Sequence, residues 1–179
     1  MTKRAVRLVP LHPDHLPHIM EWVNDPEVMG YFAGRQSPIT ENDELEYINT
    51  LNRSRNDRAW SVFDAITGEY VGQCSVNSIY FPASNGRIFL VITKNQQGKG
   101  YASAVLKALI HQGFFTLALH KLWLIVREDN TKAQEKYIKA GFQVEGLLRD
   151  EYYVQGRYHN MVRMGLINPG FSWPQNKQS

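Results

Sequence analysis

The chain has 179 residues, 43% of them hydrophobic, and a formal net charge of +3, which suits one compact, mildly basic domain. It has no run of about 18 apolar residues and no apolar stretch after its basic start, so we expect a cytoplasmic protein with no membrane association. The lone cysteine, Cys74, permits no internal disulfide or cysteine-based metal cluster, and is expected to be a small buried residue.

The first part of the chain predicts a strand, two helices and the loop between them. Residues 5–11 alternate apolar and polar side chains as a strand does, and residues 16–23 have helical spacing. We expect this first helix to end at Pro26. A second helix is predicted to start at Thr40, its N-cap, with Asp43 at the third helical position in a relative of the capping box.

An antiparallel meander and a long helix are predicted next. Three strand-like segments, 58–65, 70–81 and 87–93, are joined by recognisable turn sequences. The helix that follows is expected from about Ala102 to Leu119, because its apolar residues are spaced to cover one core-facing stripe.

The last part predicts a buried strand, a helix and a closing hairpin. The strand covers residues 122–126, and the helix is capped at Asn130 or Thr131 and stopped by Gly141 in a left-handed conformation. Two strands then surround a turn at residues 155–156. We expect one domain over residues 1–168 and a poorly ordered tail over residues 169–179.

The stretch "QQGKGYASAVLKALIHQGF" (residues 96–114) places glycines at the start of a helix that follows a strand. Unpaired N–H groups at the positive end of a helix dipole bind phosphate, and glycine lets a ligand lie against the backbone. The P-loop pattern is disfavoured because Gly100 follows Lys99, and the dinucleotide fingerprint is disfavoured because Ser103 occupies its third glycine position. The alternative is a helix start shaped by packing alone.

Two motifs carry a resemblance to a known family. Gln97 to Ala102 match a Gln/Arg-x-x-Gly-x-Gly/Ala signature, and a second segment, Asn-x-x-Ala-x-x-x-Tyr-x-x-x-Gly-Phe, matches at Asn130, Ala133, Tyr137, Gly141 and Phe142. With the element order over about residues 5–167, the chain resembles the GNAT superfamily of acetyl-CoA-dependent N-acetyltransferases. The resemblance implies an α/β GNAT fold, a mixed central sheet of about seven strands flanked by about four helices.

The resemblance also implies how the chain would hold acetyl-CoA, its co-substrate, with no metal. The backbone of one segment would bind the pyrophosphate: Gln97, Gly98, Lys99, Gly100, Tyr101 and Ala102. The end of the preceding strand, Val91, Ile92 and Thr93, would pair with the pantetheine amides. Asn130 would contact the pantetheine or phosphate region, and Lys136 would reach the adenine end.

The implied reaction is direct attack of a neutral amine on the thioester. Tyr137 would point its hydroxyl at the sulfur and protonate the departing thiolate as a general acid, although without the motif a buried aromatic role would be preferred. A backbone N–H near Ile92 or Thr93 would polarise the carbonyl. The base stays open because residues 87–93 lack the glutamate of some family members; its candidates are Glu21 or Asp25 acting through water, or Asn77 and Tyr80 ordering that water. Each acidic residue has the alternative of a solvated helix face.

The acceptor is the least determined part of the prediction. The chain looks most like the branch with ribosomal-protein N-terminal and spermidine acetyltransferases, and also resembles enzymes that acetylate amino-sugars on nucleotide carriers. The first third is acidic and walls the acceptor side in this architecture, which favours a cation: Glu21, Asp25, Glu27, Glu41, Asp43 and Glu44. Aromatic residues are candidates for lining an acceptor slot: Trp22 (equally expected in the core), Tyr31, Phe32 and Tyr80.

Three functions therefore remain in view. The first is acetylation of a small-molecule amine, polyamine-like or an amino-sugar. The second is acetylation of a peptide N-terminus, as in a ribosomal protein, which needs an open groove between Gly30 and Ser37. The third is a non-catalytic acetyl-CoA sensor, against which Tyr137 and the glycine turn argue. The basic residues cluster at the expected cofactor mouth, so no nucleic acid partner is expected. A homodimer stays open.

Overall fold

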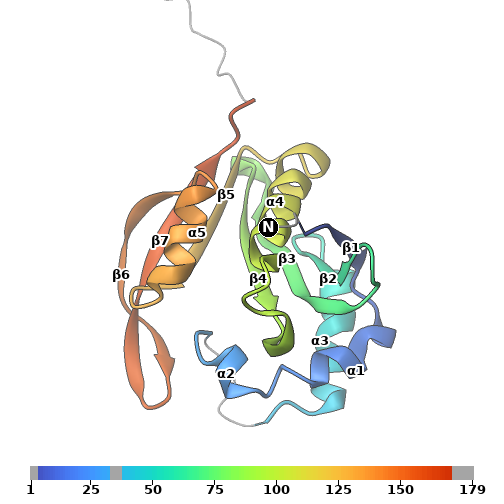
Figure 1. Cartoon of the computed structure of the whole chain (residues 1–179). Coiled ribbons are helices and arrows are strands. Elements are labelled where there is room, and N and C mark those ends of the chain that lie inside the picture. Colours follow the sequence, from blue (N-terminus) through green and yellow to red (C-terminus); the bar gives the residue numbers. More distant parts are fainter. Residues whose placement is uncertain (1–3, 33–37, 171–179) are drawn as a thin grey trace, which may run out of the picture.

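The computed structural model describes residues 4–32 and 38–170, which form one seven-stranded sheet with helices on both faces (Figure 1). The strand order is β1-β2-β3-β4-β5-β7-β6, and only β4 and β5 pair in parallel. The strands are β1 (Val6–Pro10), β2 (Arg58–Asp64), β3 (Tyr70–Tyr80), β4 (Asn85–Ile92), β5 (Lys121–Arg127), β6 (Gln143–Val154) and β7 (Arg157–Ile167).

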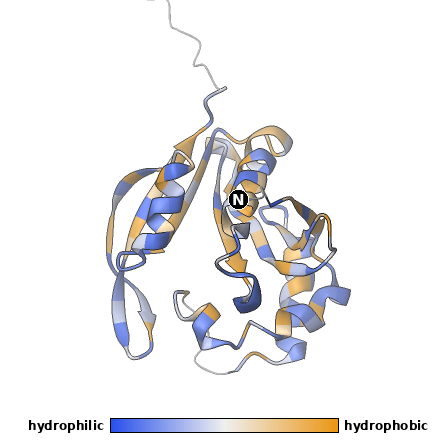
Figure 2. Cartoon of the chain, viewed as in Figure 1, coloured by the Kyte–Doolittle hydropathy of each residue, from blue (hydrophilic) through white to orange (hydrophobic). Residues whose placement is uncertain are grey.

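Five α-helices occur in the described parts of the chain: α1 (Leu16–Met20), α2 (Pro26–Met29), α3 (Glu41–Arg53), α4 (Tyr101–His111) and α5 (Thr131–Lys139). The order of strands and helices confirms the predicted mixed α/β sheet. Figure 2 shows hydrophobic residues along the strands, whereas α5 is largely hydrophilic in this view.

Local capping signals predicted several element ends correctly. The Thr40 Oγ1 accepts the Asp43 N–H at 3.2 Å, and Asp43 Oδ2 accepts the Thr40 N–H at 3.0 Å, which is the reciprocal capping box. Asn130 caps α5 by accepting the Ala133 N–H at 3.2 Å. Gly141 has a φ of 101° after that helix, as expected for a left-handed stop.

Two predicted helices are wrong in extent. The first helix ends at Met20, and Pro26 begins α2 instead of ending α1, because Asp25 caps α2 and proline suits the first helical position. The long helix ends at His111 and passes into a π-helical segment, Gln112–Thr116, before Ala118 with a φ of 50°. Gly113 lies there against Leu122, whose Cδ2 is 2.6 Å from where a Cβ would stand.

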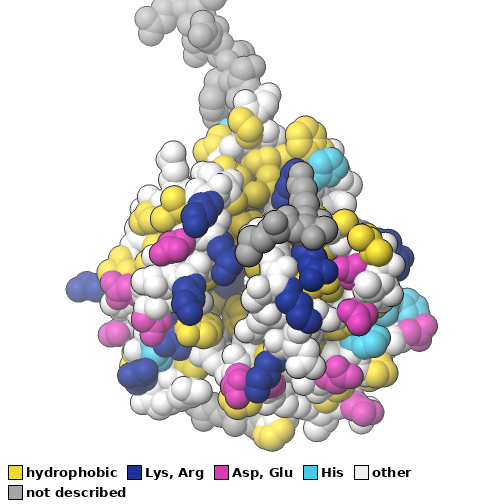
Figure 3. All heavy atoms as spheres, viewed as in Figure 1, with side chains coloured by type: hydrophobic (Ala, Val, Ile, Leu, Met, Phe, Trp, Pro, Cys, Tyr) yellow, Lys and Arg dark blue, Asp and Glu magenta, His cyan; other side chains and the backbone are white. Residues whose placement is uncertain are grey.

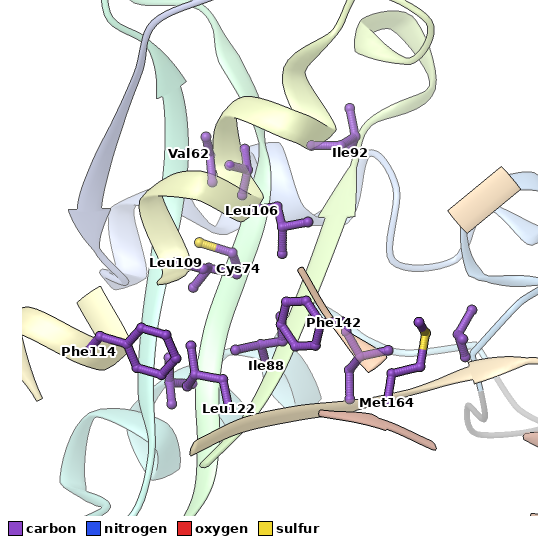
Figure 4. Close-up of a cluster of buried hydrophobic side chains, with 14 of the residues drawn as sticks. Val62, Cys74, Ile88, Ile92, Leu106, Leu109, Phe114, Leu122, Phe142 and Met164 are labelled. Atoms are coloured by element: carbon purple, nitrogen blue, oxygen red, sulfur yellow. The ribbon is translucent and has the colours of Figure 1, made fainter. Parts of the chain in front are cut away.

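The sheet separates two hydrophobic clusters. One contains buried side chains of the strands, α4 and the residues beyond α5, and Figure 4 shows Leu106 and Leu109 of α4 beside Cys74 of β3. Cys74 is fully buried, as predicted, and burial raises the pKa of its thiol. The other cluster packs α1, α2 and α3 on the opposite face and includes Trp22 and Val91, so Trp22 is a core residue.

The parallel pair β4 and β5 is joined only at its beginning. The register runs Asn85↔Lys121, Gly86↔Leu122 and Arg87↔Trp123, and no further pair follows. Beyond Arg87 the two strands diverge, and α2 lies toward the wide end of the opening (Figure 1). The divergence of β4 and β5 leaves an opening between the two strands, and the candidate active site lies in it.

Candidate active site

A cavity of about 660 Å³ lies between the diverging strands. Its walls are residues 88–92 of β4 and 124–127 of β5, with the glycine turn and α5 at one side and α2 with the residues after it at the other. Figure 3 shows Lys and Arg side chains on both sides of this hollow, and basic lining residues include Arg87, Arg127, Lys132 and Lys136. A cavity of this size accommodates part of an extended ligand.

Within the described parts of the chain, no strand pairs with the edge of β4 that faces the cavity beyond Arg87. The Thr93 N–H donates to the Val71 carbonyl at 3.0 Å, so Thr93 points its backbone toward β3. Successive residues of a strand point their backbone groups to opposite sides, so the amides of Ile92 and Leu90 face the opening. The Ile92 carbonyl accepts the side-chain amide of Gln97 at 3.0 Å. Of the two predicted carbonyl-polarising groups, Thr93 is therefore engaged, and Ile92 faces the cavity.

The glycine turn leaves space for a ligand at the start of α4. Gly98 and Gly100 have φ values of 74° and 89°, and a Cβ on Gly98 would meet no atom within 4 Å. Gly100 is the N-cap of α4, and no side chain of the described residues caps the first N–H groups of this helix. The turn thus fits the phosphates of a coenzyme A ester through backbone donors and open space.

Tyr101 anchors this turn through its side chain. Its buried hydroxyl donates to Asp64 Oδ2 at 2.6 Å, and the Asp64 Oδ1 accepts the N–H groups of Ile66 and Thr67. The Tyr101 hydrogen bond and the two backbone hydrogen bonds lower the pKa of Asp64 to about 2. The guanidinium of Arg4 lies over the Tyr101 ring, 5.0 Å from its centroid. The start of α4 is therefore held to the end of β2.

Helix α5 presents the second predicted motif to the cavity. Its lining residues are Asn130, Lys132, Ala133, Lys136 and Tyr137. The ring of Tyr137 contacts that of Phe142, with 5.9 Å between centroids, and burial raises the pKa of Tyr137 to about 12. Within the described residues its hydroxyl makes no hydrogen bond, so it can serve a ligand.

Two arginines that the sequence reasoning missed line the side of the cavity opposite α5. Arg127 is 8% exposed and donates to the Gly30 carbonyl at 2.9 Å and to Asp129, and its guanidinium lies 5.0 Å from the centroid of Tyr31. Arg87 donates to the Tyr152 hydroxyl at 2.7 Å. Arg87 is the one charged residue of its strand, a signal that could have singled it out.

Several predicted site residues do not line the cavity. Thr93 and Lys99 are outside it, and the Lys99 ammonium donates to Gln96 Oε1 at 3.1 Å. The base candidates and their helpers are also outside: Glu21, Asp25, Asn77 and Tyr80. The physical reasons are local, since the Asp25 carboxylate caps α2, the Asn77 amide donates to Ser75, and Tyr80 is 59% exposed beyond the cleft.

The other predicted residues lie together in the lining: Tyr31, Val91, Ile92, Gln97, Gly98, Gly100, Tyr101, Ala102, Asn130, Lys136 and Tyr137. Phe32 also lines it, and its ring lies 4.8 Å from Phe89. The open groove considered for residues 30–37 falls mainly on residues 33–37, outside the described residues. Among the residues that the structure describes, no three His, Cys, Asp or Glu side chains are grouped to hold a metal ion, and no helix is long and apolar enough to cross a membrane.

Comparison with known proteins agrees with this geometry. Residues 5–143 match the family described as Acetyltransferase (GNAT) domain. The chain is 32% identical over 161 residues to spermidine N(1)-acetyltransferase of Escherichia coli, covering 89% of this chain and 84% of the relative. A ribosomal-protein-bS18 alanine N-acetyltransferase of Haemophilus ducreyi is 40% identical over 72 residues, 39% of this chain and 48% of that protein.

A solved structure has the same fold. The spermidine N-acetyltransferase of Vibrio cholerae, determined in complex with CoA and spermine, superposes with a TM-score of 0.85 at 26% identity. The match covers 90% of this chain and 95% of that chain. The predicted fold class and the predicted branch are both confirmed.

Proposed function

Because this chain belongs to the GNAT family and is an acetyl-CoA-dependent N-acetyltransferase, we propose that it acetylates a primary amine of a small molecule, with Tyr137 as general acid. The observation that carries the proposal is the hydroxyl of Tyr137, which has no hydrogen-bond partner among the described residues and lies in a cavity with an open strand edge and the glycine turn.

Acetyl-CoA would lie along the diverging strands. Backbone donors at the start of α4, from Gln97 to Ala102, would hold its pyrophosphate, and Lys136 would add a positive charge toward the adenine end. The open edge of β4, including Val91 and Ile92 in its lining, would pair with the pantetheine amides. Asn130 lies where the pantetheine or phosphate region would pass.

The reaction needs one proton donor and one polarising group. The amine nitrogen forms a bond to the thioester carbonyl carbon, and the carbon–sulfur bond breaks. The N–H of Ile92 or of Leu90, both on the open edge, would stabilise the developing charge on the carbonyl oxygen. Tyr137 would give its proton to the sulfur, and its raised pKa keeps the phenol protonated at neutral pH.

The base is proposed to be solvent water. Among the described lining residues, the one carboxylate is Glu27, and it forms an ion pair with Lys94 at 2.8 Å. Neither Glu21 nor Asp25 reaches the cavity. The attacking amine would therefore lose its proton to water that enters the open cleft.

Three chemical classes of acceptor amine are considered. The relatives named for spermidine favour a polyamine, and the shorter match to a ribosomal-protein enzyme favours a peptide N-terminus. An amino-sugar is the third class. A sensor without turnover has no use for an unbonded Tyr137 hydroxyl in the cavity, so we place it last.

Thiol release from acetyl-CoA tests the proposal with a panel of polyamines, amino-sugars, amino acids and amino-terminal peptides. Saturable release with one class, sharply reduced in Tyr137→Phe, supports it. Tyr158→Phe is the matched control, because Tyr158 is 64% exposed and outside the cavity. Tight binding of acetyl-CoA without release for any amine of the panel would overturn the proposed acetylation of a small-molecule amine.

A further inference from the structure

We propose that the acceptor amine carries an acidic group, a carboxylate or a phosphate, and that Arg87 binds it. This inference rests on the proposed transfer to an amine and names the acceptor class. It is carried by a partly buried cationic side chain in the cavity, whose buried Nε has no hydrogen-bond partner among the described residues.

Arg87 lies at the narrow end of the opening, on the face away from α4. It forms the last β4–β5 pair, with Trp123, before the strands diverge. Side chains alternate along a strand, so Arg87 shares its face with Phe89, whose ring contacts Phe32. Arg87 is three residues from Leu90 on the open edge, about 10 Å along the strand. A small acceptor can span that distance between the thioester and the guanidinium.

The guanidinium of Arg87 is charged but has no carboxylate partner among the described residues. One terminal nitrogen donates to the Tyr152 hydroxyl, and the Trp123 ring centroid lies 5.8 Å from the guanidinium carbon. Its Nε is buried and has no hydrogen-bond partner. A buried unsatisfied donor is costly, and the forked guanidinium matches the paired oxygens of a carboxylate or phosphate.

Arg127, the second arginine of the cavity, differs from Arg87 because its hydrogen-bond donors have partners within the protein. Arg127 donates to both carboxylate oxygens of Asp129 and to the Gly30 carbonyl, so its charge and its donors are matched within the protein. Arg87 has no such set. Arg87, and not Arg127, is therefore the group that a ligand would complete.

The cavity lining has little negative charge with which to attract a polycation. Of the acidic residues expected to attract one, only Glu27 reaches the cavity, and Lys94 neutralises it. Glu44 is buried in α3 outside the cavity, and burial raises its pKa. A second ammonium group placed near Arg87 would meet a like charge in a partly desolvated site. An acidic group there would instead be bound.

The test compares amines that differ only in an acidic group. Suitable pairs are ethanolamine with O-phosphoethanolamine, butylamine with 4-aminobutyrate, and glucosamine with glucosamine 6-phosphate, with spermidine beside them. We expect kcat/KM to be about tenfold or more higher for the acid-bearing member of at least one pair. The phosphate and carboxylate pairs show which acid the site prefers.

Variants of Arg87 test whether its guanidinium causes the preference for acid-bearing amines. Arg87→Gln should remove it mainly through a higher KM for the acid-bearing amine, Arg87→Lys should keep part of it, and Arg87→Glu should shift preference toward spermidine. Arg163→Gln is the matched control, because Arg163 lies over the same Trp123 ring but outside the cavity. Acetyl-CoA affinity, measured by calorimetry, should stay unchanged in every variant.

The outcomes are distinguishable from failure of the proposed function. Turnover that favours spermidine or the uncharged members in the wild-type protein, or an acid preference that survives Arg87→Gln, overturns this inference and leaves amine acetylation standing. No turnover of any amine overturns both. Acid preference that is lost in Arg87→Gln and kept in Arg163→Gln supports it.

Discussion

The guanidinium of Arg127 donates to the carbonyl oxygen of Gly30 at 2.9 Å and so ties the end of β5 to the end of α2. The same guanidinium binds Asp129 and lies over Tyr31. Because Tyr31 and Phe32 follow Gly30 and line the cavity, Arg127 holds in place the wall that we propose to face the acceptor.

Removing this hydrogen bond should loosen the proposed acceptor wall and leave the proposed acetyl-CoA contacts unchanged. Arg127→Met is expected to raise the KM for the amine and to lower the free energy of unfolding by about 1–3 kcal/mol, the range for charged hydrogen bonds lost from a buried group. Steady-state kinetics and denaturant unfolding measure both. Lys94→Ala breaks an exposed ion pair to α2 and should have the smaller effect on stability. An unchanged amine KM in Arg127→Met would contradict the assigned role.

Tyr137→Phe should lower kcat by about 10²–10⁴-fold, the usual contribution of a general acid. Its affinity for acetyl-CoA should be unaffected, because only the hydroxyl is removed. Calorimetry with acetyl-CoA separates binding from chemistry. A variant with wild-type kcat would show that the sulfur receives its proton elsewhere.

The pH dependence of the wild-type rate should rise with deprotonation of the acceptor amine and show no fall from Tyr137 below about pH 11. The reason is that the acid form of Tyr137 is the active one and its pKa is raised to about 12, so it stays protonated throughout that range. A kcat profile with an alkaline limb near pH 9 that disappears in Tyr137→Phe would contradict this assignment.

The motifs that could be predicted from the sequence are those in which a short segment determines its own geometry. Gly98, the Thr40 capping box and the Asn130 cap depend on neighbours within a few positions, and all lie as expected. Arg127 and Gly30, by contrast, are 97 positions apart, and no local pattern reveals their contact. Such a contact forms only when the folded chain brings β5 and α2 together.

The acceptor side was predicted less well for the same reason. A run of acidic residues shows net charge but not which side chains reach a cavity, and Asp25 is used as a helix cap while Glu21 stays in solvent. The change from α- to π-helix at Gln112 was not predicted; it coincides with Gly113, which packs closely on Leu122, a contact of the tertiary structure.

Gly98→Val should weaken acetyl-CoA binding by filling the space above the turn. Gly68→Val is a closely matched control, because Gly68 has the same φ of 74° and a Cβ there would also meet no atom within 4 Å, but it lies in the turn between β2 and β3. Both variants carry the same backbone strain. Calorimetry should therefore show a loss of acetyl-CoA affinity only for Gly98→Val, and equal losses would contradict the assigned phosphate site.

Asp64 should make stability depend on acid pH. Its pKa is about 2 in the folded protein, below the value of an unfolded aspartate, so its contribution is complete above about pH 4 and is lost as the pH falls toward 2. Asp64→Asn should flatten the stability profile in that window, as followed by urea unfolding. Glu46→Gln, at an exposed position, serves as control. A profile that keeps its slope in Asp64→Asn would rule out this carboxyl as the source.

The most direct measurement is mass spectrometry of the amine products formed from acetyl-CoA by the wild-type protein and by Tyr137→Phe. We predict one acetyl group on the amine nitrogen of a small molecule, equimolar free coenzyme A, and a product yield in the variant reduced in line with its lower kcat. Absence of any acetylated amine, with acetyl-CoA bound and intact, would contradict it.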